Sequence, residues 1–407
     1  MQRPSSSAFA RQRIRSLNQS AVINAIHRNG RISRTDLAAE LRLSPAAITA
    51  LTAPLIEGGL VMEAAVGISA SVGRKPILLG INYDHAMVLG VKVMNQGIIA
   101  ALTNLNAEVQ AVHNEPIADT GVATVIKAIK RATEVLAPET GAAGANLIGM
   151  GVNLPGIVDH QAGSVRHSPL LGWYQVPFAA ALRDEIGLPA LIENDVNALA
   201  AAHAWFGHGR GHEAFLVVTL GRGVGLGIVI GGALHRGPRG GAGEVGHTLC
   251  TPLGARVMSG ETTTLEERLG DAGLIAQARR LLPGLPEDLD ADGLSAMAAA
   301  GTEVVLDLLH DAGSCLGSAI GDLVNVFAPS LVILGGEGLR NAAYLLPALR
   351  KALEKRTFGD LGEGLELIVD TWGDDAWARG AAGVAAARFL EEASTPLSIT
   401  RATRGSA

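Results

Sequence analysis

Residues 86–117 read AMVLGVKVMNQGIIAALTNLNAEVQAVHNEPI and contain three strand-like runs, AMVLGVKV, GIIAALTNL and EVQAVHNEPI. The turns between them are too short for a helix, so the runs predict three consecutive antiparallel strands. A helix is expected at roughly 120–136, and the apolar segment LIGMGVNLPGIVD (147–159) after it reads as a fourth strand. This order of elements is typical of an α/β lobe.

The same pattern occurs a second time. Residues 214–237 contain AFLVVTLG, GLGIVIGG and ALHRG, and after several helical segments comes the strand LVILGG (331–336). A duplicated strand-strand-strand-helix unit predicts two α/β lobes with a cleft between them, where a ligand can bind.

Polar residues cluster behind a short apolar strand, GLPALI, at the start of an Ala-rich helix. The motif IENDVNA (192–198) contains two carboxylates and two carboxamides. Such a set offers hydrogen-bond donors and acceptors to several hydroxyl groups of one ligand. A carboxylate such as Asp195 can also remove a proton from a hydroxyl group as a general base. The residues by themselves leave both roles open.

The composition is that of a folded globular protein. The 407 residues are 48% hydrophobic and 18% charged, and they are enough for two or three domains. No apolar run approaches the roughly 20 residues that span a bilayer, and the N-terminal segment lacks the apolar core of a secretory signal. The two cysteines, Cys250 and Cys315, lie far apart in the sequence and form no CxxC pair. This excludes a disulfide scaffold and a four-cysteine zinc site, and we expect a cytoplasmic protein.

Charge is distributed unequally along the chain. Residues 1–80 carry ten Arg or Lys against four Asp or Glu, a net charge of +6, whereas the whole chain has −6, which leaves −12 for residues 81–407. A basic module beside an acidic one indicates a polyanionic partner for the first and a small or neutral partner for the second. On charge alone, a solvated basic tail is the alternative.

Helix signals divide the basic module into three short helices and two strands. The segment LNQSAVINAIHRNG predicts the first helix, a capping-box pattern at Ser33 begins the second, and Ser44 followed by proline begins the third. Two strands with the basic tip Arg74-Lys75 follow as a wing. This is the pattern of a winged helix-turn-helix, and the basic excess favours DNA binding over a protein-docking role.

The expected DNA contacts follow from this interpretation. The outward side of the third helix carries alanine and threonine but no Arg, Asn or Gln for bidentate contacts with base edges. We therefore expect much of the affinity to come from phosphate contacts. The predicted DNA-binding residues are Arg34, Ser44, Thr49, Thr52, Arg74 and Lys75.

Several motifs occur together in one order along the chain. They are VGRKP (72–76), LPGIVD (154–159), LLGW (170–173), IENDVNA (192–198), GRGVGLGIVI (221–230), GGAGEVGH (240–247) and LVILGGEG (331–338). With this order and spacing, the chain resembles the ROK family of repressors, uncharacterised reading frames and sugar kinases over essentially its whole length.

The resemblance implies a multidomain chain with α+β and α/β parts. A winged helix-turn-helix is followed by a two-lobed actin-like ATPase fold of the ribonuclease H type, and the protein assembles as a homodimer or homotetramer. The expected boundaries are a basic tail at 1–16, the DNA-binding domain at 17–80, the two-lobed domain at 81–390 and a second tail at 391–407.

In the sugar binders of the family, a set of polar side chains contacts the ring hydroxyls. The resemblance carries these roles to Asn194, Asp195, Glu244, His247 and Glu266. Three carboxylates, an imidazole and an amide can donate and accept hydrogen bonds around a neutral polyol.

The two phosphate loops of the family's kinases are altered in this chain. Their Asp-x-Gly-Gly-Thr turn corresponds to residues 92–96, KVMNQ, and their Gly-Thr-Gly loop corresponds to residues 221–223, GRG. Phosphoryl transfer needs small residues around the phosphates and a carboxylate near Mg²⁺. We therefore predict that Asp195 holds a ligand without catalysing a reaction, and that the protein is not an enzyme.

Many family members hold a structural zinc ion with the motif's histidine and three cysteines. The cysteine positions correspond here to Val257, Ser259 and Thr264, which supply no thiolate. We expect neither a metal nor a cofactor.

Together these observations predict a sugar-responsive transcriptional regulator, a repressor of carbohydrate metabolism, whose partners are operator DNA and a small sugar. One alternative is an active sugar kinase with an added DNA-binding module. Another alternative is a regulator controlled by a phosphosugar or a partner protein. The basic residues Lys92 and Arg222, near the region that corresponds to the phosphate loops, support this alternative.

Overall fold

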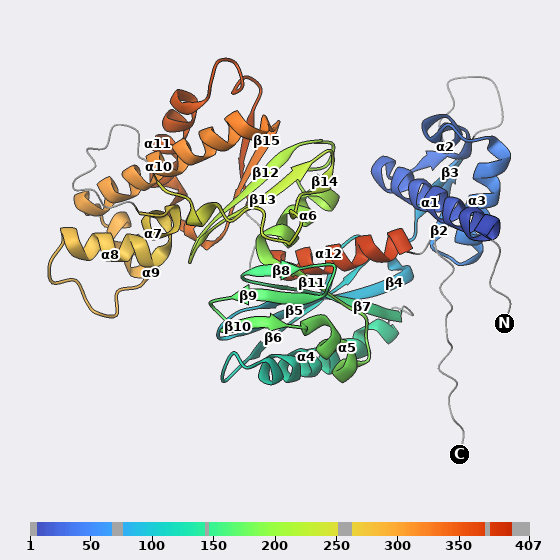
Figure 1. Ribbon diagram of the computed structural model, residues 1–407, viewed down its shortest axis with the longest axis horizontal. Helices are drawn as coiled ribbons and strands as arrows, with labels where there is room; N and C mark the ends of the chain where they lie inside the picture. Colours follow the sequence, from blue (N-terminus) through green and yellow to red (C-terminus); the bar gives the residue numbers. More distant parts are fainter. Residues whose placement is uncertain (1–5, 67–75, 143–145, 251–262, 371–374, 393–407) are drawn as a thin grey trace.

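The computed structural model describes residues 6–66, 76–142, 146–250, 263–370 and 375–392. The chain forms a winged helix-turn-helix at one end of the molecule and two α/β lobes, as the sequence predicts (Figure 1). Within the described ranges, no helix has the length and apolar character that crossing a membrane requires.

The winged helix-turn-helix contains the three predicted helices. Its elements are α1 (Ser6–Asn29), β1 (Ile32–Ser33), α2 (Arg34–Leu41), α3 (Pro45–Glu57), β2 (Val61–Val66) and β3 (Ile77–Ile81), with the strands in the order β1-β3-β2. Ser33 and Ser44 cap α2 and α3, since each hydroxyl oxygen accepts a hydrogen bond from the backbone N–H three residues later. Helix α1 continues across the boundary that the sequence analysis drew between residues 16 and 17.

The first lobe is built on a five-stranded sheet in the order β11-β7-β4-β5-β6. Its elements are β4 (Ala86–Val93), β5 (Gly97–Asn104), β6 (Val109–Pro116), α4 (Val122–Ala142), β7 (Asn146–Leu154), α5 (Phe178–Ile186) and β11 (Ala190–Asn194), preceded by the 3-10 turn η1 (Tyr83–His85). The segment LIGMGVNLPGIVD is not one strand. It breaks at Gly156, whose φ of 109° suits glycine, and a small sheet of β8 (Ile157–Asp159), β9 (Ser164–Ser168) and β10 (Trp173–Val176) follows.

The second lobe repeats this topology in the order β14-β13-β12-β15-β16. Its strands are β12 (Phe215–Leu220), β13 (Val224–Ile230), β14 (Ala233–Leu234), β15 (Leu331–Gly335) and β16 (Glu366–Val369). Its helices are η2 (Val245–His247), α7 (Leu265–Leu269), α8 (Asp271–Leu281), α9 (Ala291–Ala299), α10 (Glu303–Phe327), η3 (Glu337–Asn341) and α11 (Ala342–Arg356). In each lobe three antiparallel strands are followed by two parallel ones, so the predicted duplication is confirmed.

Two helices lie between the sheets of the two lobes, α6 (Asp195–Phe206) and α12 (Asp375–Glu392) (Figure 1). Helix α12 lies directly on the first sheet because β4 and β7 carry glycine where it crosses them. A Cβ atom at Gly90 or Gly151 would collide with the backbone oxygen of Ala378 or Ala381. These glycines therefore fix how closely the last helix of the chain packs on the first lobe.

The winged helix shares a hydrophobic core with the body. Ile26 and Leu79 of the winged helix are fully buried, and they belong to one cluster with Val88 of β4 and Ala386 and Leu390 of α12. The boundary expected between residues 80 and 81 falls inside β3, and the packing is continuous across it.

Candidate functional site

The start of α6 is fixed by Asn194, the last residue of β11. Its side-chain oxygen accepts a hydrogen bond from the Asn197 backbone N–H at 3.0 Å, and its amide nitrogen donates to the Gly156 backbone oxygen at 3.0 Å. Asn194 is therefore the N-cap of α6, and it also ties this helix to the turn after β7. Two of its hydrogen-bonding positions are taken, and the remaining donor and acceptor are what it can offer a ligand.

Asp195, Glu244, His247 and Glu266 form one electrostatic cluster. Burial raises the pKa of the Glu244 carboxyl, and the charges of Asp195 and Glu266 raise it further, while His247 opposes the shift. Burial also raises the pKa of Asp195, against the lowering effect of the Val196 N–H and of Lys92. The His247 Nε2 atom lies 3.8 Å from the Glu244 Oε2 atom. Three of the predicted sugar-binding side chains, Asp195, His247 and Glu266, thus lie close enough to Glu244 to act on its charge, and Asn194 is the neighbour of Asp195 in the chain.

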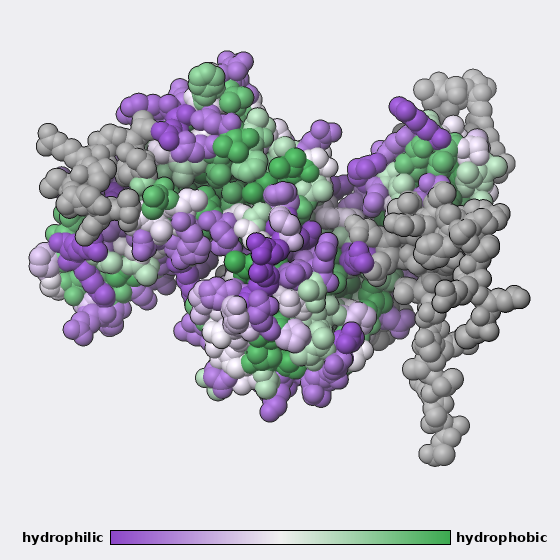
Figure 2. Space-filling model, in the orientation of Figure 1, coloured by the Kyte–Doolittle hydropathy of each residue, from purple (hydrophilic) through white to green (hydrophobic). Residues whose placement is uncertain are grey.

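Glu266 is positioned by two glycines. Side chains at Gly223 and Gly246 would occupy the space of its carboxylate, and the Val224 backbone N–H lies 3.3 Å from its Oε2 atom. Gly223 of GRG and Gly246 of GEVGH therefore leave room for the Glu266 carboxylate between the two loops. On the face seen in Figure 2, hydrophilic residues gather where the two lobes meet.

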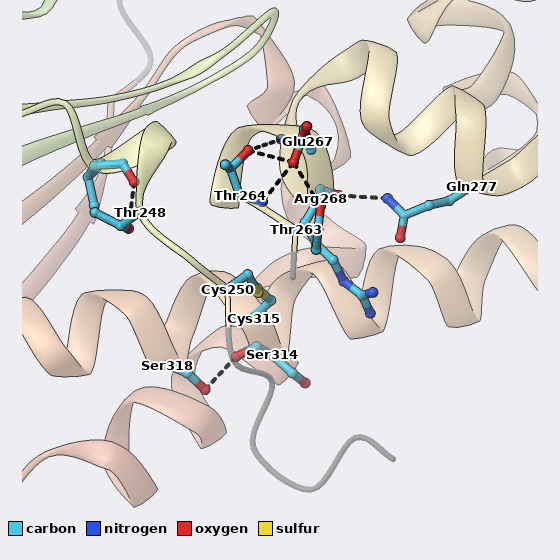
Figure 3. Close-up of a disulfide and its surroundings, with 11 residues drawn as sticks. Thr248, Cys250, Thr263, Thr264, Glu267, Arg268, Gln277, Ser314, Cys315 and Ser318 are labelled. Carbon is cyan, nitrogen blue, oxygen red and sulfur yellow. Dashed lines mark hydrogen bonds between the residues drawn. A yellow bond between two sulfur atoms is a disulfide. The ribbon is translucent and has the colours of Figure 1, made fainter. Parts of the chain in front are cut away.

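The described residues at the two ends of the segment between His247 and Glu266 are joined by contacts of their own. Leu249 and Thr264 form an antiparallel bridge, and Thr264 with Glu267 forms a complete capping box at the start of α7 (Figure 3). Thr264 stands at one of the positions where the family has a zinc-binding cysteine. The other two positions, Val257 and Ser259, lie outside the described residues.

Cys250 and Cys315 are joined by a disulfide that links this segment to α10 (Figure 3). Their Cα atoms are 6.9 Å apart although the residues are 65 positions apart in sequence. The sequence analysis made no prediction about this pairing, because sequence separation does not report where a loop returns to the core.

We predict that the purified protein contains no stoichiometric zinc. Among the described residues, no group of three or more His, Cys, Asp or Glu side chains is arranged to hold a metal ion. Elemental analysis of untagged protein tests this prediction. One zinc ion per chain would mean that the cysteine positions of the family have been assigned to the wrong residues.

The two loops that correspond to phosphate loops contain the basic residues Lys92 and Arg222, and both side chains contact other protein groups. The Lys92 Nζ atom lies 4.4 Å from the centre of the Trp377 ring, and the Arg222 Nη1 atom donates to Asn95 Oδ1 at 2.6 Å. The second contact joins the two lobes directly, since Asn95 follows β4 and Arg222 follows β12. Protein side chains thus meet at the loops that, by the resemblance, correspond to the phosphate loops of the family's kinases.

A carboxylate also lies in this region, and the sequence analysis missed it. Glu337 packs directly on Gly221, so that a Cβ atom at this glycine would collide with the carboxyl group. Glu337 lines a cavity of about 600 Å³ together with Arg222, Arg340 and Asp271. Arg340 is paired with Asp271 at 3.3 Å, so this cavity offers little uncompensated positive charge to a polyphosphate. The sequence feature that indicates this carboxylate is the position of Glu337 directly after Gly335 and Gly336, at the end of β15.

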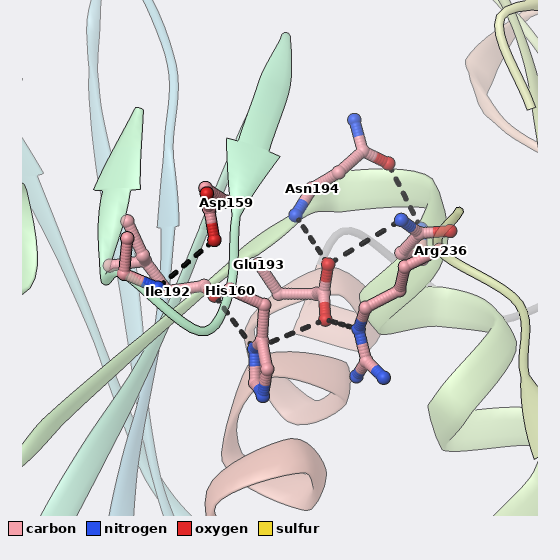
Figure 4. Close-up of polar contacts among 8 residues, drawn as sticks. Asp159, His160, Ile192, Glu193, Asn194 and Arg236 are labelled. Atoms are coloured by element: carbon pink, nitrogen blue, oxygen red, sulfur yellow. Dashed lines mark hydrogen bonds and ion pairs between the residues drawn. The ribbon is translucent and has the colours of Figure 1, made fainter. Parts of the chain in front are cut away.

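A second feature missed by the sequence analysis is the buried Glu193. Its Oε2 atom accepts a hydrogen bond from Arg236 Nε at 2.6 Å and lies 3.5 Å from His160 Nδ1, while its Oε1 atom accepts the Asn194 N–H at 3.0 Å (Figure 4). Glu193 belongs to the first lobe, and Arg236 belongs to the loop that leads to Glu244. The first carboxylate of IENDVNA therefore positions neighbouring elements, while the second faces the cluster.

The residues predicted to contact DNA are only partly available. Thr49 is exposed on α3, and so is Ser44, whose hydroxyl caps the helix. The prediction for Thr52 was wrong, because its side chain is fully buried and donates a hydrogen bond to the Ile48 backbone oxygen. The reason is the helical period, since Thr52 lies four residues after the core residue Ile48.

The basic residues of the module differ in the same way. Arg34 lies at the start of α2, where its guanidinium group pairs with Glu63 at 2.9 Å. Because an ion pair at the surface contributes little free energy, Arg34 can leave Glu63 and bind a phosphate instead. Arg74 and Lys75, the predicted wing tip, lie outside the described residues.

Comparisons with known proteins agree with the geometry. A model of the ROK family matches residues 88–388, and a model of winged helix-turn-helix DNA-binding domains matches residues 15–62. The xylose repressor of Caldicellulosiruptor bescii is 28% identical over 364 residues, which cover 85% of this chain and 89% of that protein. The DNA-binding transcriptional dual regulator NagC of Escherichia coli (strain K12) is 27% identical over 362 residues, which cover 87% and 89%.

Solved structures give the same result. A ROK family transcriptional regulator, a homologue of the E. coli MLC protein, has a TM-score of 0.80 at 26% identity, with 94% of this chain and 99% of that chain covered. A ROK family glucokinase from Streptomyces griseus, solved in complex with glucose and AMPPNP, has a TM-score of 0.61 at 25% identity, with 74% and 99% covered. The chain is thus similar both to regulators and to a kinase.

Proposed function

Because the chain belongs to the ROK family, we propose that it is a sugar-responsive repressor of carbohydrate metabolism that binds operator DNA and does not phosphorylate its sugar. The observation that carries this proposal is the contrast between two neighbouring sites. The carboxylates and the imidazole that could bind a polyol act on one another electrostatically, whereas the loops that correspond to phosphate loops are joined by the Arg222–Asn95 hydrogen bond. The relatives named xylose repressor and NagC, both similar over most of this chain, support the same function.

The cluster fits a neutral polyhydroxylated ligand better than an anion. Burial raises the pKa of Glu244, and the negative charges of Asp195 and Glu266 add to this shift. The hydroxyl groups of a sugar donate hydrogen bonds to carboxylates without adding negative charge. The same carboxylates would repel a phosphate.

We predict that the protein shows no sugar-dependent ATP hydrolysis. Arg222 is hydrogen-bonded to Asn95 and Glu337 lies on Gly221, so a γ-phosphate would have to displace this hydrogen bond and approach a carboxylate. A coupled ADP-release assay over hexoses, pentoses and amino sugars should stay at background. Turnover that depends on sugar and disappears in Asp195→Asn would instead identify an active kinase.

We propose that sugar controls DNA binding because its affinity differs between two relative orientations of the lobes. A sugar held by Asp195 of α6 and by Glu244 and Glu266 of the second lobe favours the arrangement in which these groups surround it. We propose that the protein acts as a homodimer or homotetramer, in which this rearrangement changes the spacing of two winged helices on the operator.

A further inference from the structure

Helix α6 runs from the candidate sugar site to the DNA-binding module. Its first residue, Asp195, belongs to the polar cluster. Near its other end, Trp205 lies against His27 of α1, with 4.3 Å between the ring centroids. At a rise of about 1.5 Å per residue, this helix bridges roughly 15 Å between a ligand group and the winged helix.

The winged helix is seated on both lobes. Ala382, Ala386 and Leu390 of α12 contribute to the shared core, and α12 packs on the sheet of the first lobe. Trp205 reaches the same core from α6, whose Leu199 is buried with the strands of the second lobe. A rotation of one lobe against the other therefore changes the surface on which the winged helix rests.

Helix α6 packs closely both on the second lobe and on α12, since a Cβ atom at Gly380 of α12 would lie 2.8 Å from the Ala198 backbone oxygen. Its residues Val196 and Ala200 occupy the space that side chains at Gly225 and Gly227 of β13 would need. Contacts this close leave no room for the helix to slide on its sheet, because packed interiors shift as units. A displacement at Asp195 is thus carried to Trp205.

The contact at Trp205 is built from rings and hydrogen bonds, since His27 also forms a hydrogen bond with the backbone of Trp205. His27 Nδ1 lies 2.8 Å from the Tyr83 hydroxyl group, in the segment that leads from the winged helix to the first lobe. Burial lowers the pKa of His27 to about 4, and the charges of Arg210 and Arg28 add to this shift. The imidazole is therefore uncharged near neutral pH and packs as an aromatic ring between Trp205 and Tyr83.

We propose that the contact between Trp205 and His27 transmits sugar binding from α6 to the DNA-binding module. Trp205 is a positioning residue that touches neither sugar nor DNA, and the proposal rests on the proposed function. When a sugar bridges Asn194, which is hydrogen-bonded to Gly156 of the first lobe, and Glu244 and Glu266 of the second lobe, the lobes rotate against each other. Helix α6 then carries Trp205 against α1.

The test uses the full chain with three substitutions. Trp205→Leu removes the ring contact, and Trp205→Phe retains an aromatic ring. Phe389→Leu is the matched control, because it removes an aromatic ring from the α12 side of the same core. D-xylose, N-acetylglucosamine and their phosphates serve as probes in calorimetric titrations. The DNA probe is a duplex selected by the wild-type protein from a random library.

We expect all three variants to bind sugar, and DNA without sugar, within about twofold of wild type, whereas the sugar-dependent change in DNA affinity, typically about 5- to 150-fold, is lost in Trp205→Leu. Trp205→Phe should regain most of this change, and Phe389→Leu should keep it. Hydrogen exchange of residues 18–29 in α1 should respond to sugar in wild type and not in Trp205→Leu. Should Trp205→Leu not fold, His27→Leu tests the same contact from its other side.

Two results would overturn the proposal in different ways. If wild type responds to sugar and Trp205→Leu responds equally, the signal takes another route, and loss of the response in Phe389→Leu would assign it to α12. If wild type binds neither these sugars nor their phosphates, the proposed function is wrong and the coupling fails with it.

Discussion

Replacing Asp195 with alanine is expected to weaken sugar binding by roughly ten- to several-hundred-fold, because one or two charge-assisted hydrogen bonds of about 1.5–3 kcal/mol each are lost. Part of the loss is offset, since Asp195 also repels Glu244 and raises its pKa. Affinity for DNA without sugar should remain near that of wild type, so that the variant behaves as a regulator fixed in its sugar-free state.

The measurement is DNA binding with and without sugar for Asp195→Ala, together with a direct titration of the sugar. Asp184→Ala removes an exposed carboxylate of the first lobe and serves as the control. Glu244→Ala and His247→Ala should act in the same direction, and double substitutions should be less than additive because these groups share one ligand. A normal sugar response in Asp195→Ala would show that the effector binds elsewhere.

Placing two glutamates on α3 is expected to abolish specific DNA binding. Ala46 and Ala50 are exposed one helical turn apart, so Ala46→Glu with Ala50→Glu gives one face of α3 two negative charges. Like charges brought against phosphates cost several kcal/mol, which corresponds to a loss of about 100-fold or more. Sugar affinity should not change, because the site lies at the other end of α6.

Fluorescence anisotropy with a labelled duplex at several salt concentrations measures this effect. Ala296→Glu with Ala300→Glu adds the same charges at the same spacing on exposed positions of the second lobe, and it should leave DNA binding intact. Equal weakening by both pairs would indicate that net charge, rather than the face of α3, determines the affinity. Undiminished binding by the α3 variant would place the DNA interface on another surface of the module.

The architecture could be predicted from local patterns, since strand triplets and helix caps depend on neighbouring residues. Ser33 and Ser44 cap their helices as the sequence indicates, and each strand triplet forms one side of a sheet. The break in the strand at Gly156 was missed because the apolar run continues through it. Thr52 was placed on the wrong side of α3, because alanine-rich helices give little contrast between their two faces.

Contacts between distant segments could not be predicted in the same way. Glu337 reaches Gly221, and Arg222 reaches Asn95, only because the second lobe folds back on itself and meets the first. The family resemblance predicted that Asp195, Glu244 and Glu266 belong to one site. It made no prediction for residues outside the shared motifs. The pairing of Cys250 with Cys315 and the contact of Trp205 with His27 belong to this second group.

Helix α12 is the last described element of the chain and yet lies near its centre, on β4 and β7 and beneath the winged helix. A ribosome delivers the winged helix first and this helix last. Until residues 375–392 emerge, the apolar surfaces of the winged helix and of the first sheet that pack on α12 have nothing to cover them. A nascent chain that lacks α12 therefore presents these surfaces to chaperones and proteases.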